Sequence, residues 1–481
     1  MKRRLFLWSL VFCLLLTSCA SSDRTDDQDD SVPTLIYYTI GTPDKDLSLV
    51  NEKLNEILIP NHHFAIEYHK IPFDDYGNQI NALIGSGNFD IAFTSGKTQG
   101  DYSGNAKGGV WLPLDAYLKD EYAALYNAVD PLLWKGVRVN QKIYGVPTNK
   151  ELAVPEWFVF SSELTEKYEI PVESCTSFSS LQPYLYLIKE KEPNYTPFLL
   201  DSFSHNFFAL NGYDYLIGTE LPIMFQFSQE HPTVVNILET EDGMETLQTI
   251  RRWYVDGLIN ADAALRDPND IDETTHLFCT MSSGGPLSER IWEESFHMPV
   301  QAVRVSEPIA TTSSAIGGIM AIHARTKYPK ECLKFLELVN TDPAVRNLLN
   351  YGVEGVHYEK TQNNQIRKLT NTYSGIQYTQ GNWFILDTLE GEPSNKWETF
   401  AEFNKNCTAS SLLGFSPDLS LLEAEIEAVS EIWMRYFPAI MTGSIDPDEH
   451  VPLLVKQLKQ NGIDAIQAQL QLQIDEWISS Q

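Results

Sequence analysis

Apolar residues in the first third of the chain follow two periodicities in turn. Residues 35–40, 64–68 and 90–94 are short, β-rich apolar or alternating runs, which predict strands. Between them, apolar residues recur at helical spacing over 47–58 and 76–84. The resulting order of strand, helix, strand, helix and strand predicts an α/β fold, with a mostly parallel sheet covered by helices.

Residues that break or cap helices suggest where these elements end. Pro60 is expected to stop the first helix, and Gly85 and Gly87 to close the second. Asp115 follows a turn and is expected to be the N-cap of a further helix. Residues 137–146 are broken in the middle by two polar residues and predict a hairpin.

The beginning of the chain has the pattern of an export signal. Three basic residues (2–4) precede an apolar run over 5–16, and about 12 apolar residues are too few for a permanent membrane span. Residues 1–18 are therefore expected to be a signal peptide. The following residues, 19–33, are rich in aspartate and nearly free of apolar side chains, which predicts a flexible acidic tether.

Composition limits the classes of partner. The 481 residues are too many for one ordinary core, so two or more domains are expected. A net charge of −30 argues against nucleic acid or anionic lipid as partner, because phosphate backbones need a basic surface. The cysteines after position 19 are widely spaced and are expected to be buried free thiols: Cys175, Cys279, Cys332 and Cys407.

Motifs for catalysis and metal binding are weak or absent. Gly96-Lys97-Thr98 suggests a phosphate loop, but Ile91 stands where that motif needs its first glycine. No H-E-x-x-H or G-x-S-x-G occurs. The acidic stretch 267–273 has the oxygen ligands that calcium favours but not the glycine of an EF-hand loop, so a solvated loop is expected. We expect no metal, no cofactor and no enzymatic activity.

Several motifs in a shared order resemble one protein family. Leu16-Thr17-Ser18-Cys19 looks like a bacterial lipobox, although an ordinary secretory signal with an incidental Cys19 is the alternative. With the motifs that follow it, this stretch resembles the lipid-anchored extracellular solute-binding proteins of carbohydrate-type ABC importers, in the subgroup with a C-terminal DUF3502 domain. The motifs are Phe89-Asp90-Ile91-Ala92-Phe93, Ile143-Tyr144-Gly145-Val146-Pro147, Arg252 to Asn260, Tyr328 to Pro343, Tyr351 to Tyr358, and Leu413 to Trp477.

The resemblance implies a two-lobed, periplasmic-binding-protein-like fold, each lobe a mostly parallel sheet flanked by helices. The first lobe is expected over 34–153 and 318–355, and the second over 154–317 and 356–481, with the DUF3502-like region at about 410–481. Val154-Pro155 and Ile316-Gly317-Gly318 would lie near the hinge, where glycine permits backbone change. The implied protein is a monomer held on the outer face of the cell membrane by acyl chains, such as palmitate, on Cys19.

The implied function is capture of a sugar or oligosaccharide between the lobes and delivery to permease subunits of an ABC transporter. Sugars are held by aromatic faces and by polar groups that pair their hydroxyls. The alternatives are a surface receptor for a peptide or metabolite, and a lipid-anchored glycoside hydrolase with two cleft carboxylates. By their position in loops or near the expected hinge, the candidate ligand-binding residues are Ser95, Trp111, Asn149, Lys150, Glu151, Trp157, Ser283, Gly284, Gly285 and Trp383.

Overall fold

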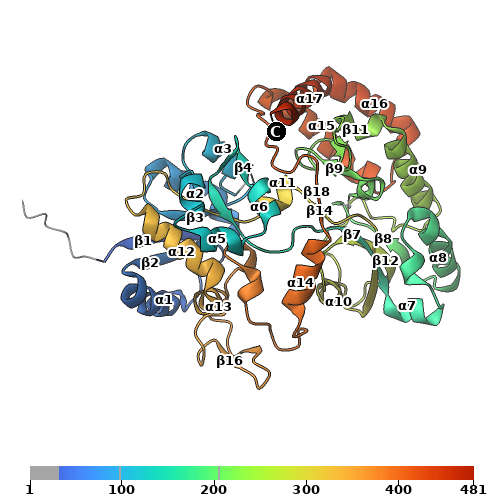
Figure 1. Ribbon diagram of the computed structural model, residues 1–481. Helices are drawn as coiled ribbons and strands as arrows, with labels where there is room; N and C mark the ends of the chain where they lie inside the picture. The colour runs from blue at the N-terminus through green and yellow to red at the C-terminus, as the bar shows by residue number, and fades with distance from the viewer. Residues whose placement is uncertain (1–31, 97–98, 204–205, 481) are drawn as a thin grey trace, which may run out of the picture.

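Two α/β lobes lie side by side, with α14, β14 and β18 between them (Figure 1). The computed structural model describes residues 32–96, 99–203 and 206–480. The expected signal peptide, Cys19 and nearly all of the expected tether lie outside the described residues, as do Lys97 and Thr98. The described residues include nearly all of the region, 34–481, over which the two lobes were expected.

The first lobe is built on a five-stranded sheet with the order β2-β1-β3-β15-β6. Strands β1, β2 and β3 are parallel neighbours, which confirms the predicted alternation of strands and helices. Its elements are β1 (Thr34–Ile40), α1 (Leu47–His62), β2 (Ala65–Ile71), α2 (Phe73–Ser86), β3 (Ile91–Thr94), α3 (Tyr102–Lys107), α4 (Asp115–Leu118), α5 (Ala123–Ala128), α6 (Pro131–Gly136), β4 (Arg138–Val139), β5 (Lys142–Ile143), β6 (Gly145–Pro147), β15 (Ile319–Ile322), α12 (Pro329–Thr341) and α13 (Pro343–Tyr351).

The second lobe has a four-stranded sheet with the order β13-β7-β12-β8 and a smaller sheet with the order β11-β10-β9. Its elements are β7 (Glu156–Ser161), α7 (Ser162–Lys167), α8 (Phe178–Lys191), β8 (Thr196–Leu199), β9 (Tyr213–Tyr215), β10 (Ile223–Gln226), β11 (Val235–Asn236), α9 (Glu241–Val255), β12 (Leu277–Ser283), α10 (Glu289–Phe296) and β13 (Val300–Arg304), followed after the third pass between lobes by α15 (Glu423–Met441), α16 (Pro447–Gln460) and α17 (Ile463–Ser479).

Both main sheets are mostly parallel, as expected, but each contains one strand that runs against the others. In the first lobe β15 runs antiparallel to β3 and β6, and in the second β7 runs antiparallel to β12 and β13. The physical reason is the path of the chain. Strands β7 and β15 each enter a lobe from the other lobe, so they start at the edge where the neighbouring strands end.

Three local expectations also differ or hold in part. Pro60 lies inside α1, which ends two residues later, because a proline in the last turn removes only one of the helix's hydrogen bonds. Gly85 likewise lies within α2, and Gly87 alone caps it with a φ of 69°. Asp115 is the first residue of α4 and not its cap: its carboxylate accepts the Ile143 N–H at 2.9 Å and so holds the hairpin of β4 and β5.

The chain passes between the lobes three times. The first pass contains Leu152, the second contains β14 (Ile309–Ala310) and α11 (Thr312–Ala315), and the third contains α14 (Lys396–Lys405) and β18 (Thr408–Ala409). Strands β14 and β18 pair in parallel, and Leu152 joins the other two passes: its N–H donates to Asn404 Oδ1 at 3.0 Å and its carbonyl accepts from Ser314 Oγ at 2.9 Å. The hinge is therefore a hydrogen-bonded bundle of three segments.

Glycine has a packing role at the second pass. A Cβ built on Gly318 would lie 2.3 Å from the carbonyl oxygen of Tyr378. The backbone of the two segments could not approach this closely with any side chain at position 318. Close packing, in addition to any hinge motion, therefore requires this glycine.

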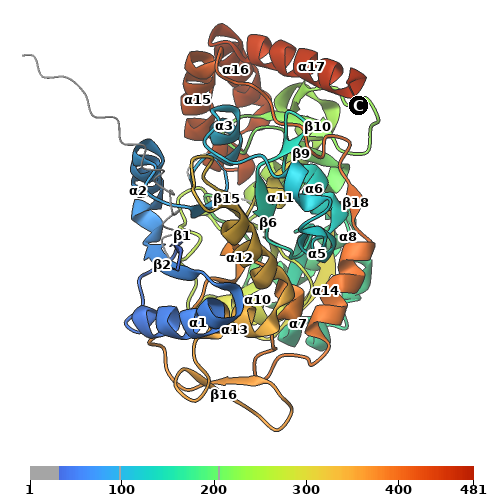
Figure 2. The same cartoon turned by 60° about the vertical axis from the view of Figure 1, so that its left-hand side comes forward.

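The segment after residue 355 was expected in the second lobe, and much of it lies against the first. Tyr373 belongs to the first-lobe core, and Lys70, whose side chain is fully buried, forms an ion pair with Asp44, donates to Ser374 O at 2.7 Å and lies over the Tyr373 ring. The hairpin of β16 (Tyr358–Lys360) and β17 (Ile366–Lys368) extends from this side of the molecule (Figure 2). The return to the second lobe is completed only near β18.

Three C-terminal helices complete the second lobe at the end marked in red in Figures 1 and 2. Val429, Leu454 and Leu470, one from each of α15, α16 and α17, are fully buried in the same core as Phe158 of β7. Gln467 and Gln471 of α17 bind the carbonyl and the N–H of Val234 next to β11. Within the described residues, no helix is long and apolar enough to cross a membrane.

Candidate functional site

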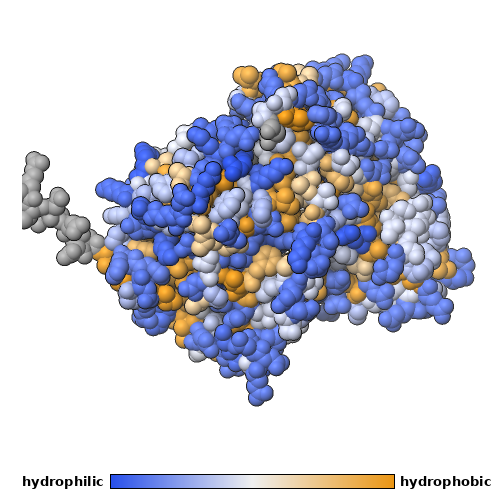
Figure 3. Space-filling view, viewed as in Figure 1, coloured by the Kyte–Doolittle hydropathy of each residue, from blue (hydrophilic) through white to orange (hydrophobic). Residues whose placement is uncertain are grey.

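The edges of the two main sheets meet where the three passes cross. In the second lobe β12 and β13 end at this edge and β7 begins there, since Ser283 pairs with Glu156 and Arg304 with Trp157. In the first lobe β3 and β6 end there, beside the start of β15. Apolar side chains gather along the middle of the face shown in Figure 3, between more hydrophilic flanks. The junction of the lobes is therefore the candidate site.

Lys150 and Glu151 lie on the first pass and form an ion pair. Lys150 Nζ donates to Glu151 Oε1 at 2.9 Å, and the two side chains are 11% and 14% exposed. Glu151 Oε2 is buried without a hydrogen-bond partner within the described chain. Gly285 of the second lobe faces Glu151, because a Cβ on Gly285 would lie 3.6 Å from Glu151 Cγ. A carboxylate with one unsatisfied oxygen thus lies where the lobes touch.

Trp157 is a half-buried aromatic side chain next to this pair. Its indole nitrogen donates to Gly284 O at 2.9 Å, and its ring centroid lies 5.8 Å from that of Trp292 in α10. Gly284 has no room for a side chain, because a Cβ there would lie 2.4 Å from Trp292 Cζ2. The glycine thus lets the two indoles approach, and it fixes the orientation of Trp157 through its carbonyl group.

Glu156 is a buried carboxyl that sequence reasoning missed. Its Oε1 accepts from Ser283 Oγ at 2.9 Å, whereas Oε2 is buried without a partner within the described chain. Burial raises the pKa of Glu156 from 4.5 to about 7, and the hydrogen bond from Ser283 opposes part of that rise. An acidic residue at the start of the otherwise apolar run 157–160 was the available signal.

Two further groups with raised pKa lie on the same side of the second lobe. Burial raises the pKa of Asp214 to about 6, although the N–H of Tyr215 lowers it in part. The pKa of Tyr215 is raised by burial and by the charges of Asp214 and Glu156. A shared region of low polarity therefore surrounds several ionisable side chains beside the hinge.

Asn149 and Trp383 lie together, but the Asn149 side chain is fully engaged within the protein. Its amide nitrogen donates to Ala128 O at 3.0 Å and to Asn382 Oδ1 at 3.1 Å, and its oxygen accepts the Asp130 N–H at 3.2 Å. The N–H of Trp383 donates to Asn149 O at 2.9 Å. Asn149 thus fastens the third pass to the first, and a ligand would have to break these bonds to reach its side chain.

Trp383 is half-buried and is held by a fully buried cation. Its indole nitrogen donates to Gln377 O at 2.9 Å, and the same oxygen accepts from Arg346 Nη2 at 3.0 Å. Burial lowers the pKa of Arg346 to about 10. The ring packs beside Trp397 and Phe400, so only part of it is left for a ligand.

The structure places Ser95 and Trp111 apart from this group. Ser95 is buried at the carboxyl end of β3, where its backbone closes a loop with Gln99 and Tyr102. Trp111 is completely buried in the first core against Phe89, so its ring offers no face to a ligand in this conformation. Of the other eight predicted residues, three lie on the first pass (149–151), Trp157 lies in β7, three lie at or just after the end of β12 (283–285), and Trp383 precedes α14.

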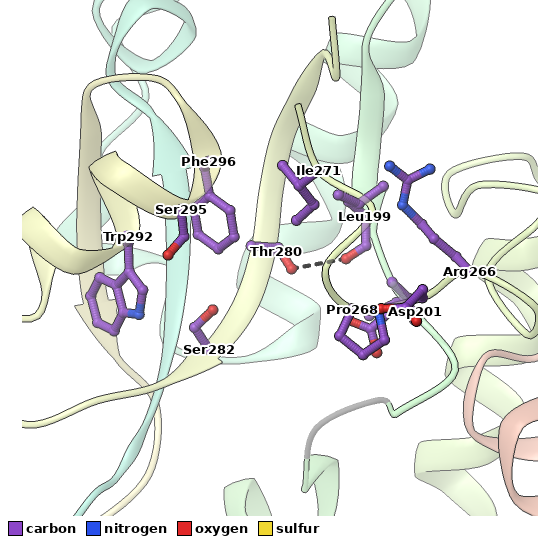
Figure 4. Close-up of a pocket in the computed structure, with 12 residues that line it drawn as sticks. Leu199, Asp201, Arg266, Pro268, Ile271, Thr280, Ser282, Trp292, Ser295 and Phe296 are labelled. Atoms are coloured by element: carbon purple, nitrogen blue, oxygen red, sulfur yellow. Dashed lines mark hydrogen bonds between the residues drawn. The ribbon is translucent and has the colours of Figure 1, made fainter. Parts of the chain in front are cut away.

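A cavity of about 210 Å³ lies at the carboxyl ends of β8 and β12, beside the Trp157–Trp292 pair. Figure 4 shows Trp292, Ser282 and Ser295 on one side of it and Asp201, Pro268 and Arg266 on the other. Sequence reasoning did not find this cavity, because residues 199–201 of its wall precede the rest of the wall, residues 266–296, by more than 60 positions.

The described residues contain no group of three or more histidine, cysteine, aspartate or glutamate side chains arranged for a metal ion. The four cysteines of the described chain are free thiols; three are buried and Cys407 is half-buried. Burial raises the pKa of Cys175, Cys332 and Cys407, and of Cys279, whose pKa the nearby Cys175 also raises. None of these groups adds a reactive centre to the junction of the lobes.

Comparisons with known proteins define the class. The domain of unknown function DUF3502 matches residues 411–479, the region of the three C-terminal helices. A carbohydrate ABC transporter substrate-binding protein of Streptococcus pneumoniae is 29% identical over 482 residues, which is 98% of this chain and 96% of the relative. Lipoprotein LipO of Bacillus subtilis is 22% identical over 324 residues, 60% of each chain.

Solved structures of solute-binding proteins also match nearly the whole chain. The N-glycan transport solute binding protein NgtS of Streptococcus pneumoniae has a TM-score of 0.81 at 28% identity, covering 93% of this chain and 99% of that chain. The chain therefore has the fold of a solute-binding protein. It resembles the substrate-binding proteins of carbohydrate ABC transporters over nearly its whole length, in the subgroup with a C-terminal DUF3502 domain, as its motifs indicated.

The similarity to NgtS differs between its solved structures. The NgtS structures in complex with Man1GlcNAc and Man5GlcNAc give TM-scores of 0.69 and 0.66, against 0.81 for the first NgtS structure. All three cover 93% of this chain, so its overall conformation is more similar to that of the first structure than to those of the two complexes.

Proposed function

We propose that this protein is a lipid-anchored solute-binding protein that captures a neutral oligosaccharide between its lobes and delivers it to an ABC transporter permease. The observation that carries the proposal is the similarity over nearly the whole chain to proteins described as carbohydrate-binding. The junction of the lobes has the chemistry that sugars require: half-buried indoles at Trp157 and Trp383, and carboxyl groups at Glu151 and Glu156.

Closure of the lobes would follow from contacts that exist only when a ligand bridges them. A sugar ring stacked on Trp157 of the second lobe can pair its hydroxyls with Lys150 and Glu151 on the first pass. A ligand shifts such an equilibrium only by its difference in affinity for the two arrangements. The proposed ligand therefore binds unchanged and leaves unchanged.

Isothermal titration calorimetry against Man1GlcNAc, Man5GlcNAc and a set of peptides tests this function. We expect binding of at least one oligosaccharide and none of the peptides, with the sugar recovered intact by mass spectrometry. Binding of a peptide alone would favour a peptide or metabolite receptor instead.

The raised pKa of Glu156 is the one observation that would also suit a glycoside hydrolase, so this residue provides the control. A general acid needs a pKa near the working pH, and the pKa of Glu156 is raised to about 7. If the bound sugar is cleaved and Glu156→Gln stops the cleavage while sparing binding, the protein is an enzyme. Under our proposal Glu156→Gln changes affinity at most, because there is no turnover to lose.

The lipid anchor is tested separately. Cys19→Ala removes the thiol that acylation requires, and two acyl chains are what hold such a protein firmly at a membrane. We expect the variant to leave the membrane fraction and, once purified, to bind sugar as the unaltered protein does. A variant that stays with the membrane would contradict lipidation at Cys19.

A further inference from the structure

The cavity beside Trp292 has a size between that of a few waters and that of an extended ligand. Its volume is about 210 Å³. Pockets for drug-sized ligands are larger, at ~300–1,000 Å³. The cavity is therefore suited to one sugar ring and too small for a whole oligosaccharide.

Apolar and polar groups line the cavity together. Trp292 and Phe296 of α10 lie on the same side as Ser282 and Ser295, whose hydroxyls make no hydrogen bond to other described residues (Figure 4). Ile271, from the loop before β12, lies across the cavity from them. Aromatic rings beside groups that can pair with hydroxyls suit a pyranose ring.

Two loops joined by a hydrogen bond form another part of the wall. The N–H of Ser202 donates to Arg266 O at 3.0 Å, and Arg266 Nη1 donates to Asp262 Oδ2 at 3.3 Å. The Nε of Arg266 is buried without a partner within the described residues, which leaves one donor for a ligand oxygen. The acidic stretch that begins at Asp267, expected to be a solvated loop, is thus part of the cavity wall.

Charge restricts the kind of sugar. Two carboxylates, Asp201 and Asp267, line the cavity together with one cation, Arg266, whose guanidinium is already paired with Asp262 and with the backbone of Asp270. An added carboxylate would meet an excess of negative charge at short range. Uronic acids and sialic acids are therefore disfavoured relative to neutral rings.

We propose that this cavity is a specificity pocket that takes one neutral pyranose residue of the oligosaccharide bound at the lobe junction. Trp292 connects the two sites, since it lines the cavity and contacts Trp157. The proposal rests on the proposed sugar-binding function and adds a second point of recognition, for a branch or an end of the glycan.

A plug at the rim of the cavity tests the pocket. Ser295 is exposed, so Ser295→Phe can block the entrance without disturbing the core, and Glu294→Phe places the same ring one residue away, outside the cavity. By calorimetry we expect Ser295→Phe to weaken Man5GlcNAc binding at least tenfold, and Glu294→Phe to leave it unchanged. Equal affinities of Ser295→Phe and the unaltered protein would overturn the pocket. If Trp157→Ala weakens binding and Ser295→Phe does not, the proposed sugar-binding function stands and only the pocket is refuted.

A second measurement does not depend on the oligosaccharide. Crystals soaked with methyl α-mannoside or N-acetylglucosamine should show a ring in the cavity of the unaltered protein and none in Ser295→Phe, and methyl glucuronide should be absent from both. Neither neutral sugar in the cavity would contradict the pocket. A ring in the cavity of a protein that binds no oligosaccharide would support the pocket and contradict the proposed function.

Discussion

Replacement of Glu156 by glutamine isolates the effect of burying one carboxyl beside the hinge. Glutamine keeps the oxygen that accepts the Ser283 hydroxyl and has nearly the same shape, but it carries no charge at any pH. Because the side chain of Glu156 is buried and Oε2 has no partner within the described chain, ionisation is costly in the folded state.

The direction of the pH dependence follows from the raised pKa. The folded protein holds the proton on Glu156 up to about pH 7, whereas the unfolded chain releases it near 4.5. Between these values the folded state binds more protons, so the stability of the unaltered protein falls as the pH rises through this window. Below this pH window the Glu156 carboxyl is neutral in both states and does not reduce stability. Above the window the full free-energy cost of ionising the buried carboxyl is present.

The size of the effect comes from the same two values. A pKa of about 7 against 4.5 corresponds to about 3 kcal/mol at ~1.4 kcal/mol per pH unit. The free energy of unfolding of Glu156→Gln should therefore exceed that of the unaltered protein by about 3 kcal/mol more at pH 8 than at pH 4.5.

Urea unfolding followed by tryptophan fluorescence between pH 4.5 and pH 8 measures this difference. Glu294→Gln, which makes the same substitution at an exposed position, is the control. A constant difference between Glu156→Gln and the unaltered protein across the range would refute the reasoning, because it would mean that Glu156 ionises in the folded state as readily as in the unfolded chain.

Three further predictions concern the first lobe and the site. Asp44→Asn leaves Lys70 buried without its counter-charge and should cost ~3–5 kcal/mol in thermal unfolding, whereas Lys53→Met, which breaks an exposed pair, should change stability little. Trp157→Ala should weaken oligosaccharide binding about tenfold in calorimetry, with an unchanged circular dichroism spectrum. Arg346→Met removes the donor that helps to fix Gln377 O, so the fluorescence anisotropy of a protein that keeps Trp383 as its only tryptophan should fall; an unchanged anisotropy would mean that packing alone holds the ring.

Local patterns predicted the elements of the first lobe well. The alternation of β1, α1, β2, α2 and β3 follows directly from two periodicities, and Asn140 and Gln141, both with positive φ, make the predicted hairpin turn. The antiparallel β15 lies outside what such patterns show, because its neighbours β3 and β6 are more than 170 residues earlier in the chain.

The sequence suggested where along the chain the candidate residues lie, but not how their side chains pack. The stretch from Asn149 to Trp157 and the end of β12 do lie at the junction of the lobes, but only burial shows that Asn149 is engaged by the protein and that Trp111 is inside the core. The cavity beside Trp292 depends on loops that are remote in sequence. Tertiary packing brings these walls together, and the periodicity of apolar residues along the chain does not show which loops will meet.

The second-lobe core bears on the order in which the protein can fold. Its members extend from Phe158 to Ile474, so the lobe that begins with β7 is not closed until α17, the last helix, is in place. The first lobe is also completed late in synthesis, because β15 and α12 follow β3 by more than 220 residues. Contacts of such long range form slowly. We therefore expect a nascent chain of this kind to complete neither lobe until most of it has been synthesised.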